Sequence, residues 1–335
     1  MATLAQNALT LADWAKRLDP DGKVPAIVEL LGQTNEILDD MLFLEGNLPT
    51  GHRTNVRTGL PTVAWKLINQ GVTPSKSTTA QIDEACGIME AWSEVDKDLA
   101  MLNGNTAAFR LSEARAFIEA MNQEMASTLF YGNQSLSPEE FTGLSPRYSS
   151  LSGVENAENV ITGGGSGSDN TSIWLVCWGD QTVCGIFPKG SKAGLQHEDK
   201  GEKTIETANG SAEGKRLDVY QDKWQWKVGL ALKDWRYAVR IPNIDISDLV
   251  ANSGSQANVV NLMIKAMHRL PNMNMGRCAF YMNRTVRQML DIQRRDDVAG
   301  AGMTYKEVDG KLIPQFRGIP IRVCDALLET ESAVS

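Results

Sequence analysis

Residues 224–246, WQWKVGLALKDWRYAVRIPNIDI, constrain the fold more than any other stretch of the chain. Large apolar side chains occupy alternate positions, first even and then odd: Trp224, Trp226, Val228, Leu230 and Leu232, then Trp235, Tyr237, Val239 and Ile241. A period of two predicts half-buried β-strand, and the change of phase predicts a bulge or bend near Lys233–Asp234. Pro242 has no backbone N–H to give to a ladder, so we expect it to end the strand.

The chain places many large side chains on this extended ribbon and has few residues that could do chemistry. This balance favours a protein that forms a wall or a surface over a catalyst. The apolar fraction of 42% and the charged fraction of 22% are those of a soluble globular protein. No apolar run approaches the ~20 residues that cross a bilayer, and the start of the chain lacks the features of a secretory signal. We therefore expect a cytoplasmic protein without a membrane partner. The net charge of −8 argues against tight wrapping of nucleic acid but leaves room for a weak basic patch.

The five cysteines are an odd number and contain no C-x-x-C pair. Cys177 and Cys184 are close enough in sequence for a hairpin disulfide. Buried, reduced thiols in strands are the favoured interpretation.

Helical periodicity is clearest over residues 105–131, where apolar side chains recur every three or four positions. Asn103 or Asn105 could cap this helix, and Gly132-Asn133 is a natural stop. Two further helical patterns, about 1–18 and 25–44, precede it.

Residues 51–95 are predicted to form a long two-stranded arm. Its strand-like runs cover 56–71 and 78–95, with a turn at 72–75. An isolated hairpin of that length is marginal in water, so it should lie on another element or another chain. The later chain is predicted to contain loop at 134–172, strands at 172–190, a polar segment at 191–215, a helix at 256–270, a strand at 278–283, a helix at 283–295 and a last strand at 317–328.

Candidate chemical sites are weak. His52, His197 and His268 lie far apart in unlike contexts, which disfavours a metal site or a catalytic triad. His197-Glu198-Asp199 is interpreted as a solvated loop, because no apolar neighbours would shift a pKa there. The run Gly163–Gly167 lacks the Walker lysine and is interpreted as a flexible linker. We therefore predict no catalytic residue, no cofactor and no metal.

The strand region carries five of the eight tryptophans: Trp174, Trp178, Trp224, Trp226 and Trp235. They could form a carbohydrate-binding face. Burial in a core or a subunit contact is favoured, because aromatic rings carry large buried area and are enriched in interfaces.

Four passages, taken together, resemble the major capsid proteins of tailed double-stranded DNA bacteriophages, most nearly those of short-tailed phages. They are LPTVAWKLINQGVTPSKSTTAQ, GLALKDWRYAVRIPNIDIS, YMNRTVRQMLD and FRGIPIRVCDALLETES, within residues 55–330. The resemblance implies the α+β Hong Kong 97-type capsid fold. It divides the chain into an N-terminal arm at 1–50, an extended loop at 51–95, a peripheral domain at 96–250 and an axial domain at 251–335. The peripheral domain would hold a spine helix at 105–131 and long strands at 172–246. In the commoner arrangement the axial block precedes the last peripheral strands, so the order here implies rearranged connectivity.

The implied function is a structural one, without enzymatic activity. Hexamers and pentamers of this chain would close an icosahedral shell around the phage genome, assembled in the host bacterial cytoplasm and kept in the virion. The implied partners are other copies, a separate scaffolding protein, a portal and a decoration or cement protein, with weak non-specific contact to packaged DNA. We predict inter-subunit contacts at Arg53, Arg57, Trp65, Lys66 and Trp14. No motif of this chain carries over the Lys, Asn and Glu that cross-link some family members.

Two alternatives stay open. An encapsulin-like nanocompartment would use the same architecture around protein cargo. A glycan-binding or hydrolytic protein could instead use the tryptophan strands with an Asp/Glu pair.

Overall fold

The computed structural model describes residues 32–102, 106–206, 215–251, 257–296, 303–308 and 311–335. The chain divides into two compact units, each with its own apolar core. The first unit comprises residues 1–33, 88–125 and 194–227, and the second comprises 34–87, 126–193 and 228–335. Among the described residues, no helix is both long and apolar enough to cross a membrane.

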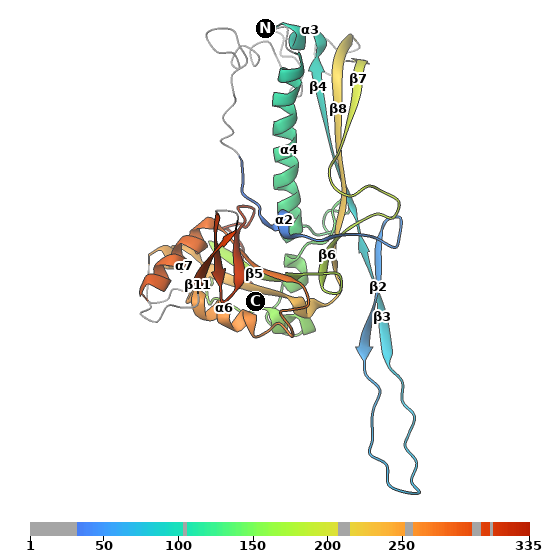
Figure 1. The fold of residues 1–335 in the computed structure, drawn as a ribbon, viewed down its shortest axis with the longest axis vertical. Coiled ribbons are helices and arrows are strands. Elements are labelled where there is room, and N and C mark those ends of the chain that lie inside the picture. The colour runs from blue at the N-terminus through green and yellow to red at the C-terminus, as the bar shows by residue number, and fades with distance from the viewer. Residues whose placement is uncertain (1–31, 103–105, 207–214, 252–256, 297–302, 309–310) are drawn as a thin grey trace. The chain divides into compact units, whose positions relative to one another are not determined.

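The first unit packs a long helix against three strands of an 11-stranded sheet (Figure 1). In that sheet β8 (Arg216–Leu232) lies between β7 (Gln196–Glu206) and β4 (Gly87–Asp96). The helices are α3 (Lys97–Met101) and α4 (Thr106–Tyr131), and the ends of α4 and β8 continue into the second unit. Val95, Ala100 and Phe109 form a core cluster with Tyr220 against it.

The long helix was predictable from its period. α4 confirms the predicted helix at 105–131, and Met121, Met125 and Leu129 of the apolar stripe are buried. The helix ends before Gly132, where a Cβ atom would lie 2.6 Å from the carbonyl oxygens of Thr128 and Phe141. Glycine is therefore required at the stop. The proposed caps at 103 and 105 lie outside the described residues.

The polar segment preceding β8 is not a loop. The prediction of a solvated loop at His197–Asp199 is wrong, because β7 pairs antiparallel with β8 from Gln196↔Gln225 to Glu206↔Arg216. An edge strand needs no apolar alternation when its backbone is satisfied by a neighbouring strand. Hydropathy alone therefore did not reveal it.

The second unit is built on a sheet whose central strand, β5, is buried along its whole length. β5 pairs antiparallel with β9 and β10, β10 pairs parallel with β13, and β6 pairs with β1 and with residues 229–232 of β8. The strands are β1 (Phe43–Glu45), β5 (Asn170–Trp178), β6 (Val183–Phe187), β9 (Ala238–Asp245), β10 (Arg277–Met282), β11 (Met303–Val308), β12 (Lys311–Phe316) and β13 (Ile319–Val323).

Short helices cover this sheet and enclose the main core (Figure 1). Their apolar residues, among them Leu249, Met263 and Leu290, pack with Ile173, Leu175 and Phe280 of the strands. The helical segments of the unit are α2 (Ile37–Asp40), α5 (Ile246–Val250), α6 (Val259–Met267), α7 (Arg284–Asp296), and the 3₁₀ turns η1 (Ser145–Tyr148), η2 (Glu155–Asn159) and η4 (Trp235–Tyr237). The strands predicted at 172–190, 278–283 and 317–328 and the helices predicted at 256–270 and 283–295 are confirmed, with different bounds.

The ribbon at 224–246 is broken where its phase changes, but it differs from the prediction in two ways. β8 ends at Leu232, and η4 separates it from β9. The prediction that Pro242 ends the strand is wrong, because β9 runs on to Asp245. Between Thr171↔Ile244 and Ile173↔Ile241 the register shifts, and Asn243 takes a positive φ of 61°. Pro242 thus sits at a bulge, where no ladder donor is needed. β9 is also buried on both faces, not half-buried.

The glycine run packs against this bulge. Gly163 N donates to Pro242 O and Gly165 N donates to Asn243 O, both at 2.8 Å. A Cβ atom on Gly163 would meet Asn243 O at 2.6 Å. The flexible-linker interpretation is therefore wrong: glycine is needed here for close backbone approach.

The N-terminal expectations are only partly testable. The helix predicted at about 1–18 lies outside the described residues. Of the helix predicted at 25–44, the described part contains the single turn α2, and Phe43–Glu45 is instead a strand parallel to β6. That part of the prediction is wrong, because Phe43 pairs with Gly185 in the sheet.

Candidate functional site

A hairpin of the second unit carries the most exposed apolar side chains of the described chain. β2 (Gly51–Gly59) and β3 (Thr78–Ala85) pair antiparallel from Gly51↔Ala85 to Gly59↔Thr78, with an irregularity between Arg57 and Gly59. Figure 1 shows the hairpin continuing beyond its strands as an open loop. The arm predicted at 51–95 is thus a shorter paired hairpin with a long loop, followed by the separate strand β4.

The loop, residues 60–77, contains no strand. The chain reverses at Ile68–Asn69, where Asn69 has a φ of 67° and Gln70 N donates to Leu67 O. The predicted turn at 72–75 is therefore misplaced. Asparagine tolerates the left-handed conformation better than most residues, and this was the overlooked turn signal.

Apolar exposure on the loop is extreme. Trp65 is 103% exposed, and the large apolar side chains Leu60, Val63, Leu67 and Ile68 are all at least 68% exposed. Scattered exposed apolar residues are ordinary in a monomer, but a contiguous set of this size marks an interaction surface. The loop surface is also basic, because residues 55–81 include Arg57, Lys66 and Lys76 but no acidic residue.

The base of the hairpin is held by an ion pair that sequence reasoning missed. Glu84 on β3 accepts two hydrogen bonds from Arg147, at 2.5 and 2.6 Å, and both side chains are largely buried. Arg147 Nη2 also donates to Thr142 O at 2.9 Å. Glu84 and Arg147 are 63 positions apart, so no local pattern in the sequence could pair them.

The neighbouring cross-strand pair is exposed. Arg53 donates to both carboxylate oxygens of Asp83 at 2.6 Å, and the Arg53 backbone N–H donates to Asn47 Oδ1 at 2.7 Å. The Arg53 hydrogen bond holds the pKa of Asp83 below its ordinary value. Arg53, predicted to contact another subunit, is thus engaged within its own hairpin in the isolated chain.

Neutralising the buried carboxylate should cost much more than neutralising the exposed one. Glu84→Gln leaves Arg147 buried with a weaker partner, so we expect the free energy of unfolding to fall by about 1–3 kcal/mol. Asp83→Asn, one residue away, is the matched control and should leave the free energy of unfolding close to that of the wild type. Urea unfolding of both variants measures the difference, and equal losses would contradict the anchoring role of Glu84.

The other predicted contact residues divide into two groups. Arg57, Trp65 and Lys66 are brought together on the exposed hairpin and its loop. Trp14 lies outside the described residues.

Three of the five tryptophans in the strand region are buried. Trp174, Trp178 and Trp224 are at most 2% exposed. Trp224 stacks between Phe117 and His197, with ring centroids 5.2 and 5.1 Å away. Rings packed in this way cannot stack on a sugar, so these three tryptophans do not contribute to a glycan-binding platform.

The histidines also lie apart, on β2 for His52, on β7 for His197, and just after α6 for His268. His197 Nε2 lies 2.9 Å from Asp222 Oδ1, and Arg110 donates to both Asp222 and Asp199. Within the described ranges, no group of three or more His, Cys, Asp or Glu side chains could hold a metal ion.

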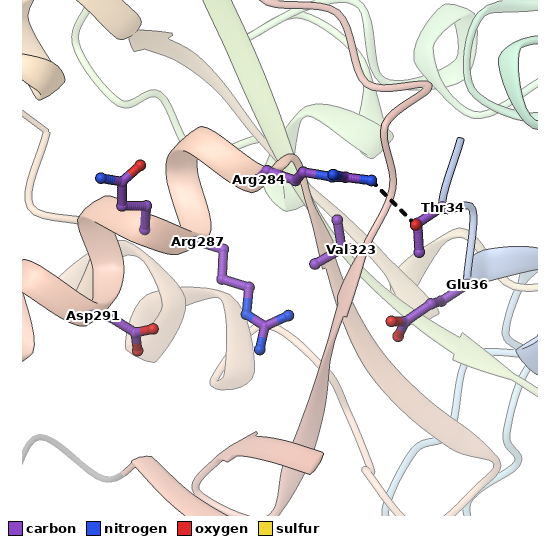
Figure 2. Close-up of a pocket in the computed structure, with 7 residues that line it drawn as sticks. Thr34, Glu36, Arg284, Arg287, Asp291 and Val323 are labelled. Atoms are coloured by element: carbon purple, nitrogen blue, oxygen red, sulfur yellow. Dashed lines mark hydrogen bonds between the residues drawn. The ribbon is translucent and has the colours of Figure 1, made fainter. Parts of the chain in front are cut away.

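A charged recess of about 540 Å³ lies between α7 and the segment before α2 (Figure 2). Its lining residues are Thr34, Glu36, Arg284, Arg287, Gln288, Asp291 and Val323. Arg284 is held by two hydrogen bonds to Asp325, at 2.6 and 2.8 Å, and donates to Thr34 Oγ1 at 3.2 Å. The described lining contains no cysteine, serine or histidine.

Comparison with known proteins identifies the family. The sequence model of the major capsid protein GP7 family matches residues 19–335. This chain belongs to that family. No curated protein sequence matches the chain. A chain in the near-atomic structure of bacteriophage Epsilon15 is 30% identical, with a TM-score of 0.77, covering 100% of this chain and 99% of that one.

Two further similarities are weaker. The bacteriophage JBD30 capsid gives a TM-score of 0.47 at 11% identity, covering 89% of this chain and 92% of that chain. The encapsulin of Synechococcus elongatus PCC 7942 gives a TM-score of 0.43 at 12% identity, covering 70% of this chain and 96% of that chain. The family assignment does not depend on either of them.

The predicted family and the Hong Kong 97-type fold are confirmed. The capsid protein is a structural, shell-forming component of the virion, not an enzyme.

Proposed function

We propose that this capsid protein assembles as hexamers and pentamers into an icosahedral shell around double-stranded phage DNA, and that the 60–77 loop of each copy lies on a neighbouring copy. The observation that carries the second part is the exposure of Trp65 at the tip of an acid-free loop. Apolar surface left in water is costly at roughly 25 cal/mol per Å². A second copy that covers this apolar surface would remove it from water, and the free energy gained would stabilise the contact between the two copies. Arg53, Arg57, Lys66 and Trp14 are proposed as further inter-subunit contacts.

The four-part division of the chain stays a proposal: an arm at 1–50, an extended loop at 51–95, a peripheral domain at 96–250 and an axial domain at 251–335. The compact units follow other boundaries, since the second unit includes residues 34–87 and 126–193 as well as 228–335. β5 pairs with both β9 and β10, so strands from both sides of the proposed boundary at 250 belong to one sheet. This pairing supports a rearranged connectivity.

Further partners are proposed by resemblance to the family. We propose a separate scaffolding protein, a portal and a decoration protein, with assembly in the host bacterial cytoplasm. The net charge of −8 favours only weak, non-specific contact with packaged DNA.

Cross-linking from the loop tests the proposed contact. A photoreactive amino acid placed at Lys66, which is exposed and beside Trp65, should join two chains in assembled particles. The same variant after dissociation of the particles should give only single chains. Cross-links confined to one chain in intact shells would contradict the proposal.

The cargo is tested separately. Shells purified from infected cells and treated with nuclease should retain protected double-stranded DNA. Shells that protect a protein cargo and no DNA would favour the encapsulin-like alternative.

A further inference from the structure

Two cysteines of the second unit face each other across adjacent strands. Cys177 on β5 is directly opposite Cys278 on β10 in the antiparallel register. Their sulfur atoms are 2.8 Å apart, and the two residues are 101 positions apart in sequence. Both cysteines are free thiols in this structure.

The backbone geometry allows a covalent bond between them. Directly opposed residues of antiparallel strands have Cα atoms about 4.5–5.5 Å apart, and disulfides span Cα separations of about 4.4–6.8 Å. The Cα separation of such a pair therefore falls within the range that a disulfide spans. Cross-strand Cβ separations of about 4.5–5.5 Å exceed the usual disulfide value near 3.8 Å, which makes such a bond easier to reduce than a relaxed one.

The two thiols differ in their exposure to solvent. Cys177 is fully buried in the core that contains Tyr237 and Phe280. Cys278 is only partly buried, and its sulfur also lies 3.4 Å from the carbonyl oxygen of Met273, in the exposed segment that precedes β10. A small reagent can therefore approach the pair from the side of Cys278. The hydrogen bond that Cys278 donates to Cys177 lowers the pKa of the Cys177 thiol and raises the pKa of the Cys278 thiol, so that the two sulfur atoms share a proton.

The other three cysteines are also disfavoured as thiolates. Burial raises the pKa of Cys86 and of Cys184 to about 11, and burial also raises the pKa of Cys324. A thiol is nucleophilic only as its thiolate, so these groups stay inert near neutral pH.

We propose that Cys177 and Cys278 are a redox-sensitive pair, reduced inside the cell and joined as an intrachain disulfide when the shell meets a small-molecule disulfide oxidant. The pair gives up one proton and shares the other, and when the shared proton lies on Cys177 the more accessible Cys278 thiolate attacks one sulfur of the oxidant and expels the first half as a thiolate. The Cys177 thiolate then attacks Cys278 Sγ and expels the second half. One S–S bond breaks in the oxidant and one forms in the protein, and the two protein protons go to the two thiolates released. The oxidant takes up the two electrons.

The bond would strengthen the subunit after the particle leaves a reducing compartment. A disulfide stabilises mainly by restricting the unfolded chain, and the effect grows with the length of the loop that it closes. Here the closed loop contains β6, β7, β8, β9, α5 and α6, which is most of the second half of the chain. The oxidised subunit should therefore melt at a higher temperature than the reduced one.

Thiol counting on the full-length protein tests the proposal. Protein purified with reductant and then incubated with oxidised glutathione should lose two of its five thiols, measured after denaturation. Its mass should fall by two hydrogen atoms, and digestion should yield the Cys177–Cys278 cross-linked peptide. Cys86→Ala should behave as the wild type does, whereas Cys278→Ala should form no intrachain disulfide and show no rise in melting temperature.

Two results would overturn the proposal. One is retention of all five thiols in the folded wild type after prolonged oxidation. The other is a disulfide mapped to any other pair, such as Cys177–Cys184. The wild-type measurement decides the matter even if Cys278→Ala folds poorly.

Discussion

Deleting residues 60–77 and joining Gly59 to Thr78 through a short Gly-Ser turn should abolish shell formation while the subunit still folds. Every residue of the deleted loop is exposed, and its hydrogen bonds, such as Gln70 N to Leu67 O and Ser75 Oγ to Thr62 O, join loop residues to one another. Its removal therefore takes nothing from either described core. The anchored base of the hairpin, including Glu84 and Arg147, is untouched. Circular dichroism should report a normal fold, and particle counts by negative-stain electron microscopy should fall to background.

A single substitution refines the same test. Trp65→Ala removes the most exposed aromatic ring of the loop, and truncating an interface tryptophan commonly costs about 2 kcal/mol or more. A loss of about 2 kcal/mol corresponds to a roughly 30-fold weaker contact. The protein concentration at which shells begin to form should therefore rise by roughly 30-fold if each subunit buries this ring in one contact. Leu136→Ala is the matched control, because Leu136 is 82% exposed on another loop of the same unit. Normal shells from the deletion, or equal effects of the two substitutions, would refute the role of the loop.

Sequence patterns predicted the elements whose signal is local. The stripe of α4 repeats every three to four residues over the length of a 26-residue helix, so that no other structure fits it. β5 and β6 were recognisable as short apolar runs bounded by turn residues. The exposed hairpin was predictable as an arm too long to be stable alone. The position of its reversal was not, because Pro74 and Ser75 gave a stronger apparent turn signal than Asn69.

The remaining features depend on partners distant in sequence. β7 is polar on both faces, and it is a strand only because β8 accepts its backbone pairing. Pro242 lies inside β9 because β5 accommodates a bulge opposite it. Likewise, the proximity of Cys177 to Cys278 follows from the pairing of β5 with β10, whereas the sequence suggested Cys184 as the nearer partner. Such pairings are set by tertiary packing, which a hydropathy pattern does not encode.

Replacing the buried Arg240 should produce the largest loss of stability of any single substitution considered for this protein. The side chain is 6% exposed, and it binds Glu331 Oε2 at 2.8 Å, Tyr148 O at 3.0 Å and Ser172 Oγ at 3.2 Å. Burial and the Glu331 carboxylate raise the pKa of Tyr131, so its hydroxyl stays protonated and donates to Glu331. Arg240→Met leaves that carboxylate buried without its cation, which should lower the free energy of unfolding by about 3–5 kcal/mol.

Urea unfolding of full-length protein, at concentrations below those that assemble, measures this loss. Arg236→Met is the matched control, since Arg236 is 55% exposed and pairs with Asp234 at the surface, and it should change stability by less than about 1 kcal/mol. The double variant Arg240→Met/Glu331→Gln should recover part of the loss, because it removes the uncompensated charge. The physical reason is that Glu331, once unpaired, keeps a buried charge whose removal from water costs free energy. The ion pair itself contributes little net stability. A small loss for Arg240→Met, or no recovery in the double variant, would show that Glu331 is neutralised by another route.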